Sequence, residues 1–236
     1  MAGKTLQLQP RLQLLADLVP VGAKLADVGT DHGYLPVWLL QQGSISRAIA
    51  SDINAEPLEH ARKTAAEYGV SEQMDFRLCA GLEKIASCEV DTVVIAGMGG
   101  ETIQSILAAA PWTKNEGVQL LLQPMTKVEM LRIWLSDNGY HFTGERLVFD
   151  KDFLYPILCV TGGRGEPISE EESYAGRLLG EEPLYGMYLE QQIRKLQRRI
   201  DGLRRSESSD TAEEAGRLEE IRLSMVKRRK DIPCIR

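Results

Sequence analysis

Residues 25–34 read LADVGTDHGY, an apolar run followed by two glycines that three polar residues separate. Glycine allows a positive φ and a close approach of the backbone to a ligand, and a helix that follows presents unpaired N–H groups. A strand, a glycine loop and a helix in this order are typical of a doubly wound α/β sheet, which binds ligands where the strand ends. The stretch therefore predicts a strand over residues 24–28 and a binding site directly after it.

The same alternation of apolar runs and helical patterns continues on the C-terminal side. Expected strands cover residues 24–28, 47–51, 74–79, 90–96 and 118–123, and expected helices cover 36–42, 56–68, 101–110 and 127–137. This order favours right-handed crossovers and a largely parallel sheet. Residues 140–150 and 153–161 follow with only a short turn between them, which predicts an antiparallel hairpin at the sheet edge.

A break in the pattern at residues 162–167, GGRGEP, marks the expected domain boundary. We expect a first domain over residues 1–165 and a helical appendage over 166–236. Within the appendage, apolar residues at spacings of four, three, four and three run from Leu189 to Leu203, which is a heptad-like seam. Helices over 184–205 and 211–230, joined by a polar turn at 206–210, predict an antiparallel coiled-coil hairpin.

Composition and charge narrow the class of protein. The chain has 236 residues, 43% of them hydrophobic, which excludes disorder and a disulfide-stapled mini-domain. Its net charge of −6 divides into −10 over residues 1–184 and +4 over residues 185–236. The four cysteines form no CxxC pair, and the sequence shows no signal segment and no apolar run of bilayer length, so we expect a cytoplasmic protein without a membrane partner.

The charges in the first loop indicate which cofactor it binds. The spacing is DxGxDxG and not the GxGxxG of dinucleotide sites, and Asp31 stands where a pyrophosphate would have to lie. Asp27 and Asp31 instead suit the sulfonium and ammonium groups of S-adenosylmethionine. Asp52 closes the second strand 19 residues after Gly33, near the spacing of a carboxylate that accepts hydrogen bonds from ribose, although a turn residue is an alternative.

A second glycine-rich loop, Gly97-Met98-Gly99-Gly100, follows the fourth expected strand at the same edge of the sheet. A tight turn without a ligand is the alternative, but three glycines within four residues indicate close backbone approach to a ligand. The expected cofactor-binding set is Asp27, Gly29, Thr30, Asp31, His32, Gly33, Asp52, Ile53, Ala80, Gly81, Leu82, Ala96, Gly97, Met98 and Gly99. We expect no metal, since His60 and His141 lack metal-ligand spacing to cysteines or acids.

The strings ADVGTDHGYLP at residues 26–36 and AGMGG at 96–100, followed by LQP at 122–124 and a helical tail, resemble the bacterial tRNA (adenine-22-N1)-methyltransferase family, TrmK. The resemblance covers most of the chain in order. It implies a class I, Rossmann-like methyltransferase fold, S-adenosylmethionine as donor, and N1 of an adenine in the D-arm region of tRNA as acceptor. One departure is Ala80, where similar methyltransferases often carry Asp or Asn that binds the adenine amino group of the cofactor.

Roles for single residues follow from the chemistry of N1 methylation, in which positive charge passes from sulfur to the adenine ring. Asp31 is the expected catalytic residue, because a carboxylate near the acceptor stabilises that charge; orienting the cofactor is its alternative role. For His32 we expect helix capping or packing under the loop, and Tyr34 is the candidate for stacking on the base. The basic residues expected to bind tRNA phosphates are Arg194, Lys195, Arg198, Arg199, Arg204 and Arg205.

Two other function classes stay open at this stage. A methyltransferase-like scaffold that has lost catalysis and binds cofactor or protein partners is favoured by Ala80 and opposed by the intact acids of the first loop. An NAD-dependent oxidoreductase is disfavoured by Asp31. We expect a monomer or a weak homodimer.

Overall fold

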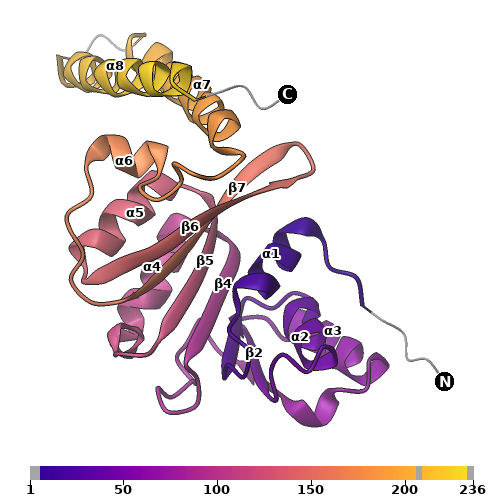
Figure 1. The fold of residues 1–236 in the computed structure, drawn as a ribbon. Helices are drawn as coiled ribbons and strands as arrows, with labels where there is room; N and C mark the ends of the chain where they lie inside the picture. The colour runs from indigo at the N-terminus through magenta and orange to yellow at the C-terminus, as the bar shows by residue number, and fades with distance from the viewer. Residues whose placement is uncertain (1–5, 206–208, 233–236) are drawn as a thin grey trace.

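The computed structural model describes residues 6–205 and 209–232 (Figure 1). Seven strands form one sheet: β1 (Leu25–Val28), β2 (Ala48–Asp52), β3 (Met74–Leu78), β4 (Thr92–Gly99), β5 (Gln119–Thr126), β6 (Tyr140–Asp150) and β7 (Phe153–Gly162). The helices are α1 (Pro10–Leu18), α2 (Tyr34–Gln41), α3 (Ala55–Glu67), α4 (Gly100–Ala109), α5 (Val128–Asp137), α6 (Glu170–Ala175), α7 (Tyr185–Leu203) and α8 (Ser209–Lys230). Two short 3-10 helices cover Ser71–Gln73 and Pro111–Lys114.

The sheet order is β3-β2-β1-β4-β5-β7-β6. The first five strands are parallel, and β7 pairs antiparallel with both β5 and β6. The chain moves outward from β1 to β3 and then returns to place β4 on the other side of β1. The carboxyl ends of β1 and β4 therefore lie side by side, at the position where open α/β sheets bind ligands. The predicted doubly wound sheet with an antiparallel edge hairpin is confirmed.

Helices cover both faces of the sheet because the strands are apolar on both faces. Alternate residues of a strand enter different cores: Val94 joins the core under α1 and α2, whereas Val93 and Ile95 join the core under α4 and α5. This period of two follows from strand geometry. All three side chains are fully buried.

A third core joins the C-terminal helices to the sheet. Helices α7 and α8 pack against each other, and Leu189, Leu196 and Met225 in their seam are fully buried. The same core contains Leu147 of β6 and Leu154 of β7, so the helical hairpin rests on the β6–β7 edge of the sheet (Figure 1). The predicted helical hairpin is confirmed, while its coiled-coil geometry and the boundary at residue 165 stay predictions. Residues 206–208 of the expected turn, and Cys234, lie outside the described residues.

Two helices were not expected from the sequence pattern. Helix α1 carries Pro at its first position, which is a typical helix start. Helix α6 follows the predicted boundary at residues 162–167, in a segment for which the sequence predicted no separate helix. Its capping box accounts for it: Ser169 Oγ accepts from the Glu172 N–H, and a Glu172 carboxylate oxygen accepts from the Ser169 N–H.

Strand β4 also runs further than expected, through the second glycine loop to Gly99. Its pairing with β5 continues there through two register shifts, so the loop is an irregular strand end and not an open turn. Gly100, which begins α4, packs so tightly that a Cβ atom would lie 2.6 Å from the Lys127 carbonyl oxygen. None of the helices in the described ranges has the length and apolarity needed to cross a bilayer.

Candidate active site

The loop after β1 has the conformation that its two glycines predict. Gly29 and Gly33 have φ values of +77° and +66°, a region that other residues rarely adopt. A Cβ atom on Gly29 would lie 2.1 Å from Met98 Cε, and one on Gly33 would lie 3.0 Å from Ala61 Cβ. The Gly29 N–H donates to the Ser51 carbonyl oxygen at 2.8 Å, which ties the loop to the end of β2.

This loop lines a cavity of about 640 Å³ at the carboxyl ends of β1 and β4. The cavity brings together nine residues that the sequence singled out, from segments that lie far apart in the chain. They are Asp27, Gly29, Thr30, Asp31, His32, Gly33, Tyr34, Ala96 and Gly97. The predicted position of the binding site is therefore supported by a hollow of ligand size.

Asp27 provides a buried carboxyl group to this cavity. The residue is only 8% exposed, and no Lys, Arg or His of the described chain forms an ion pair with it. Burial raises its pKa to about 6; the nearby Thr30 side chain opposes this rise, and the charge of Asp52 adds to it. A buried carboxylate without a cationic partner favours a ligand that brings its own positive charge.

Asp31 differs from Asp27 because its side chain is 78% exposed. One carboxylate oxygen lies 3.6 Å from Nε2 of His32. His32 does not cap α2, which begins after Gly33 without a side-chain hydrogen bond. Its ring instead stacks on Tyr34 on one side, with 5.0 Å between centroids, and on His60 on the other, with 4.9 Å. The packing role expected for His32 is thus confirmed, and the capping role is wrong.

The stacking also places potential ligand atoms of Asp31, His32 and His60 within 4.8 Å of one another. Sequence spacing could not show this, because His60 lies on α3 and approaches the loop only through the fold. The expectation of an enzyme without a metal stays a prediction.

Seven of the expected cofactor residues do not line the cavity. They are Asp52, Ile53, Ala80, Gly81, Leu82, Met98 and Gly99. Asp52 accepts a hydrogen bond from the Asn54 N–H at 2.8 Å, which is the turn role that the sequence left open. Leu82 belongs to the core, and Met98 fills the space beside Gly29. A cofactor role for these seven residues stays a prediction.

The sequence did not single out Gln9, Arg11, Leu12 and Met125, which also line the cavity. Nη1 of Arg11 donates to Gln123 Oε1 at 3.0 Å, and the same oxygen accepts from the Gly97 N–H at 3.1 Å. Arg11 Nε lies 3.7 Å from an Asp150 carboxylate oxygen. No local pattern reveals Arg11, because its partners lie more than a hundred residues away in the chain.

The expected tRNA-binding residues of α7 and its C-terminal turn are all exposed, and they fall into two groups. Lys195, Arg199 and Arg204 form ion pairs with Glu129, Glu214 and Glu219, respectively. Among the described residues, no ion pair involves the second group, which is Arg194, Arg198 and Arg205. The second group is the better candidate for contact with a polyanion.

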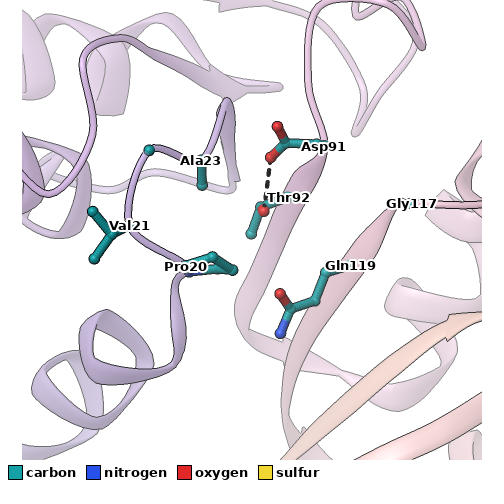
Figure 2. Close-up of a pocket in the computed structure, with 8 residues that line it drawn as sticks. Pro20, Val21, Ala23, Asp91, Thr92, Gly117 and Gln119 are labelled. Carbon is teal, nitrogen blue, oxygen red and sulfur yellow. Dashed lines mark hydrogen bonds between the residues drawn. The ribbon is translucent and has the colours of Figure 1, made fainter.

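Figure 2 shows another hollow, of about 260 Å³, where β4 and β5 begin. Asp91 accepts hydrogen bonds there from the Lys24 N–H at 2.9 Å and the Thr92 hydroxyl at 3.0 Å. This hollow lies at the amino ends of the strands, opposite the cavity at Asp27. Its only charged residue, Asp91, already has local partners, so we assign it no functional role.

Comparison with known proteins agrees with this geometry. Residues 8–158 match the methyltransferase domain family. The chain is 33% identical over 184 residues to the tRNA (adenine(22)-N(1))-methyltransferase of Bacillus subtilis strain 168, covering 78% of this chain and 75% of that protein.

Solved structures extend the similarity to nearly the full chain. The B. subtilis m1A22 tRNA methyltransferase TrmK superposes with a TM-score of 0.83 at 26% identity, covering 96% of this chain and 100% of the other. M. capricolum TrmK, solved with the cofactor product S-adenosyl-homocysteine, superposes with a TM-score of 0.78 at 28% identity, covering 93% of this chain and 98% of the other. The chain therefore belongs to the family of tRNA (adenine(22)-N(1))-methyltransferases.

Proposed function

We propose that the protein transfers the methyl group of S-adenosylmethionine to N1 of adenine 22 in the D-arm region of tRNA. The observation that carries the proposal is the buried, unpaired carboxyl group of Asp27 in a ligand-sized cavity at the carboxyl edge of the sheet. This position and this charge suit a cationic cofactor. The M. capricolum relative was solved with S-adenosyl-homocysteine, the natural cofactor product, and the B. subtilis relative is a tRNA methyltransferase.

Some residues of the cavity would hold the cofactor, and another would assist methyl transfer. When bound, S-adenosylmethionine supplies a methyl group on a positively charged sulfur. Asp27 and the backbone around Gly29 and Gly97 would hold it, since glycine leaves the backbone accessible there. Asp31, exposed at the cavity, would stabilise the positive charge that develops on the adenine ring. Alignment is the main requirement, because adenine N1 already carries a free lone pair.

The C-terminal hairpin supplies the cationic surface that the acidic body lacks. Three exposed arginines have no acidic partner within the described residues: Arg194, Arg198 and Arg205. Phosphate groups can therefore bind them without breaking an ion pair among those residues. We therefore assign the tRNA backbone to this face of the hairpin. A tRNA substrate also agrees with the expected cytoplasmic location.

The proposal is tested by methyl transfer from labelled cofactor to an unmodified tRNA transcript, with the product nucleotide mapped. We expect 1-methyladenosine at position 22 with the wild type, and with Asp31→Ala a loss of rate at saturating cofactor that is larger than any loss of cofactor affinity. Equal rates would remove Asp31 from the mechanism. Cofactor binding without any transfer to tRNA would instead support the scaffold hypothesis, and binding of NADH the oxidoreductase hypothesis.

A further inference from the structure

A second cavity, of about 400 Å³, adjoins the cofactor cavity. It lies between the carboxyl end of β5, the beginning of β7 and one face of α7. Met125 lines both cavities, so the two cavities meet at this side chain. The mechanism described above uses none of the other residues of the second cavity, although its volume suits a small aromatic ligand.

One wall of this cavity is aromatic. Phe153 and Tyr155 are two residues apart on β7 and so project to the same face, with 6.3 Å between their ring centroids. Phe153 is 59% exposed, so its ring is accessible to a ligand. The Arg11 guanidinium lies 5.8 Å from the centre of the Tyr155 ring and reaches Gln123 and Met125 at the cofactor cavity. Arg11 thereby connects the aromatic wall to the cofactor cavity, which it also lines.

The opposite wall carries an amide group that lacks a partner. Gln192 on α7 is only 6% exposed and lines the cavity, yet it makes no side-chain hydrogen bond to any described residue. Its neighbour Gln191 differs: its amide donates to the Leu154 carbonyl oxygen and accepts from the Leu154 N–H. Neither amide atom of Gln192 is among the fully buried polar atoms that lack a partner, so both are accessible from the cavity and can pair with a ligand that supplies a donor and an acceptor.

We propose that this second cavity receives the acceptor adenine and that Gln192 recognises its Hoogsteen edge. Oε1 of Gln192 accepts from the N6 amino group and Nε2 donates to N7, which is the pairing that glutamine makes with adenine. Phe153 and Tyr155 supply the aromatic surface for a base that has left its stack. The inference rests on the proposed function and deepens it, since it assigns the acceptor subsite of the same reaction.

This orientation leaves N1 free for reaction. N1 itself is not contacted by Gln192, which binds only N6 and N7, and N1 can face the cofactor cavity beside Met125. The N1 lone pair forms the new bond to the methyl carbon while the carbon–sulfur bond breaks and its electron pair stays on sulfur. The positive charge passes to the adenine ring, and the thioether product leaves neutral. Neither a nucleophilic side chain nor a further reactant is required.

The experiment compares two tRNAs, one with adenine and one with 7-deazaadenine at position 22, with wild type and Gln192→Leu. Wild type should methylate the 7-deaza tRNA about tenfold more slowly, since the loss of one hydrogen bond of about 1.4 kcal/mol corresponds to tenfold. Gln192→Leu should methylate the tRNA with adenine slowly, and its rate should not fall further on the tRNA with 7-deazaadenine. Comparing the two rate ratios removes any intrinsic effect of the analogue on N1.

Gln197→Leu is the matched control, since it makes the same change on the same helix outside the cavity, where the amide of Gln197 bonds to Asp201. Gln197→Leu should keep the wild-type ratio of the methylation rates on the two tRNAs. Both variants should bind S-adenosyl-homocysteine as the wild type does, which shows that they fold. A wild-type ratio in Gln192→Leu would overturn the subsite assignment while leaving the proposed function intact. Failure of the wild type to methylate position 22 would overturn both.

Discussion

Arg132 and Glu145 form an ion pair in which both side chains are fully buried, with 2.7 Å between Nε and Oε1. Nη1 of Arg132 also donates to the Ser173 carbonyl oxygen at 2.8 Å and the Tyr188 hydroxyl at 3.1 Å. The other oxygen of Glu145 accepts from the backbone N–H groups of residues 177–178, each at 2.7 Å. The pair thus connects α5 and β6 of the methyltransferase sheet to α6 and α7.

Arg132→Met tests how much this network contributes to stability. Burial lowers the pKa of Arg132, but the charges of Glu145 and Tyr188 and the hydrogen bonds to both side chains together outweigh this effect and raise the pKa above its ordinary value, so the guanidinium is charged. Its removal leaves the Glu145 carboxylate buried and uncompensated. We expect the free energy of unfolding, measured by denaturant titration, to fall by about 3–5 kcal/mol.

The neighbouring Arg146 supplies the control. It is half exposed and 3.5 Å from Glu182, so Arg146→Met should cost no more than about 1 kcal/mol. Where Arg132→Met proves too unstable to purify, the double variant Arg132→Met/Glu145→Gln should recover part of the loss because it removes the unpaired charge. Similar losses for Arg132→Met and Arg146→Met would contradict a special role for the buried pair.

The first glycine loop could be predicted from the sequence because its signals are local. A strand, two glycines with positive φ and a helix lie within ten residues, and their order places the loop at the ligand edge of the sheet. The seam of α7 could be predicted for the same reason, since its spacing is visible within one helix.

The second cavity could not be predicted, because no sequence pattern relates its walls. Met125, Phe153 and Gln192 come from β5, β7 and α7, and only the tertiary fold brings them together. The burial of Arg132 could not be predicted either. It lies in a helical pattern, where an arginine ordinarily faces solvent, yet it is fully buried against Glu145. The extent of β4 was missed because two glycines so close together are rare in a strand, and only pairing with β5 extends it.

Charge reversal on the hairpin tests the tRNA-binding surface. Changing Arg194, Arg198 and Arg205 to Glu removes cations that have no acidic partner in the described chain. We expect tRNA affinity to fall at least tenfold at low salt and the slope of log affinity against log salt to decrease by about 2 to 3, with cofactor affinity unchanged. Filter binding over a salt series measures both quantities.

The control for this variant changes the net charge equally at a distant place. Lys24, Arg47 and Lys63 are exposed, form no ion pair in the described part of the chain, and lie in the region of β1, β2 and α3, far from the hairpin in Figure 1. Changing these three residues to Glu should reduce tRNA affinity much less. Equal losses from the two triple variants would show a general charge effect and no hairpin site.

Asp27→Asn should stabilise the ligand-free protein in a manner that depends on pH. The folded-state pKa of about 6 lies above the ordinary value of 3.8, so ionisation of Asp27 disfavours the folded state as pH rises from about 4 to 6. The variant cannot ionise, and its gain over the wild type should reach up to about 3 kcal/mol at pH 8 and vanish near pH 4. Denaturant titrations at both values measure it, with the exposed Asp137→Asn, expected within about 0.5 kcal/mol, as control. A gain that does not change with pH would contradict the burial of an ionisable carboxyl group.

The same carboxyl group should make cofactor affinity depend on pH. Below about pH 6, Asp27 of the ligand-free protein takes up a proton and loses the charge that attracts a cation, so binding must release that proton. We expect the affinity for S-adenosylmethionine, measured by calorimetry between pH 4.5 and 7, to fall by up to about tenfold for each unit below pH 6. Asp27→Asn should bind more weakly at pH 7 and show a flat profile, because no group at position 27 then titrates. The opposite result would be a wild-type affinity that stays constant over this range and a binding heat that does not vary with the ionisation enthalpy of the buffer. It would mean that the charge of Asp27 does not hold the cofactor.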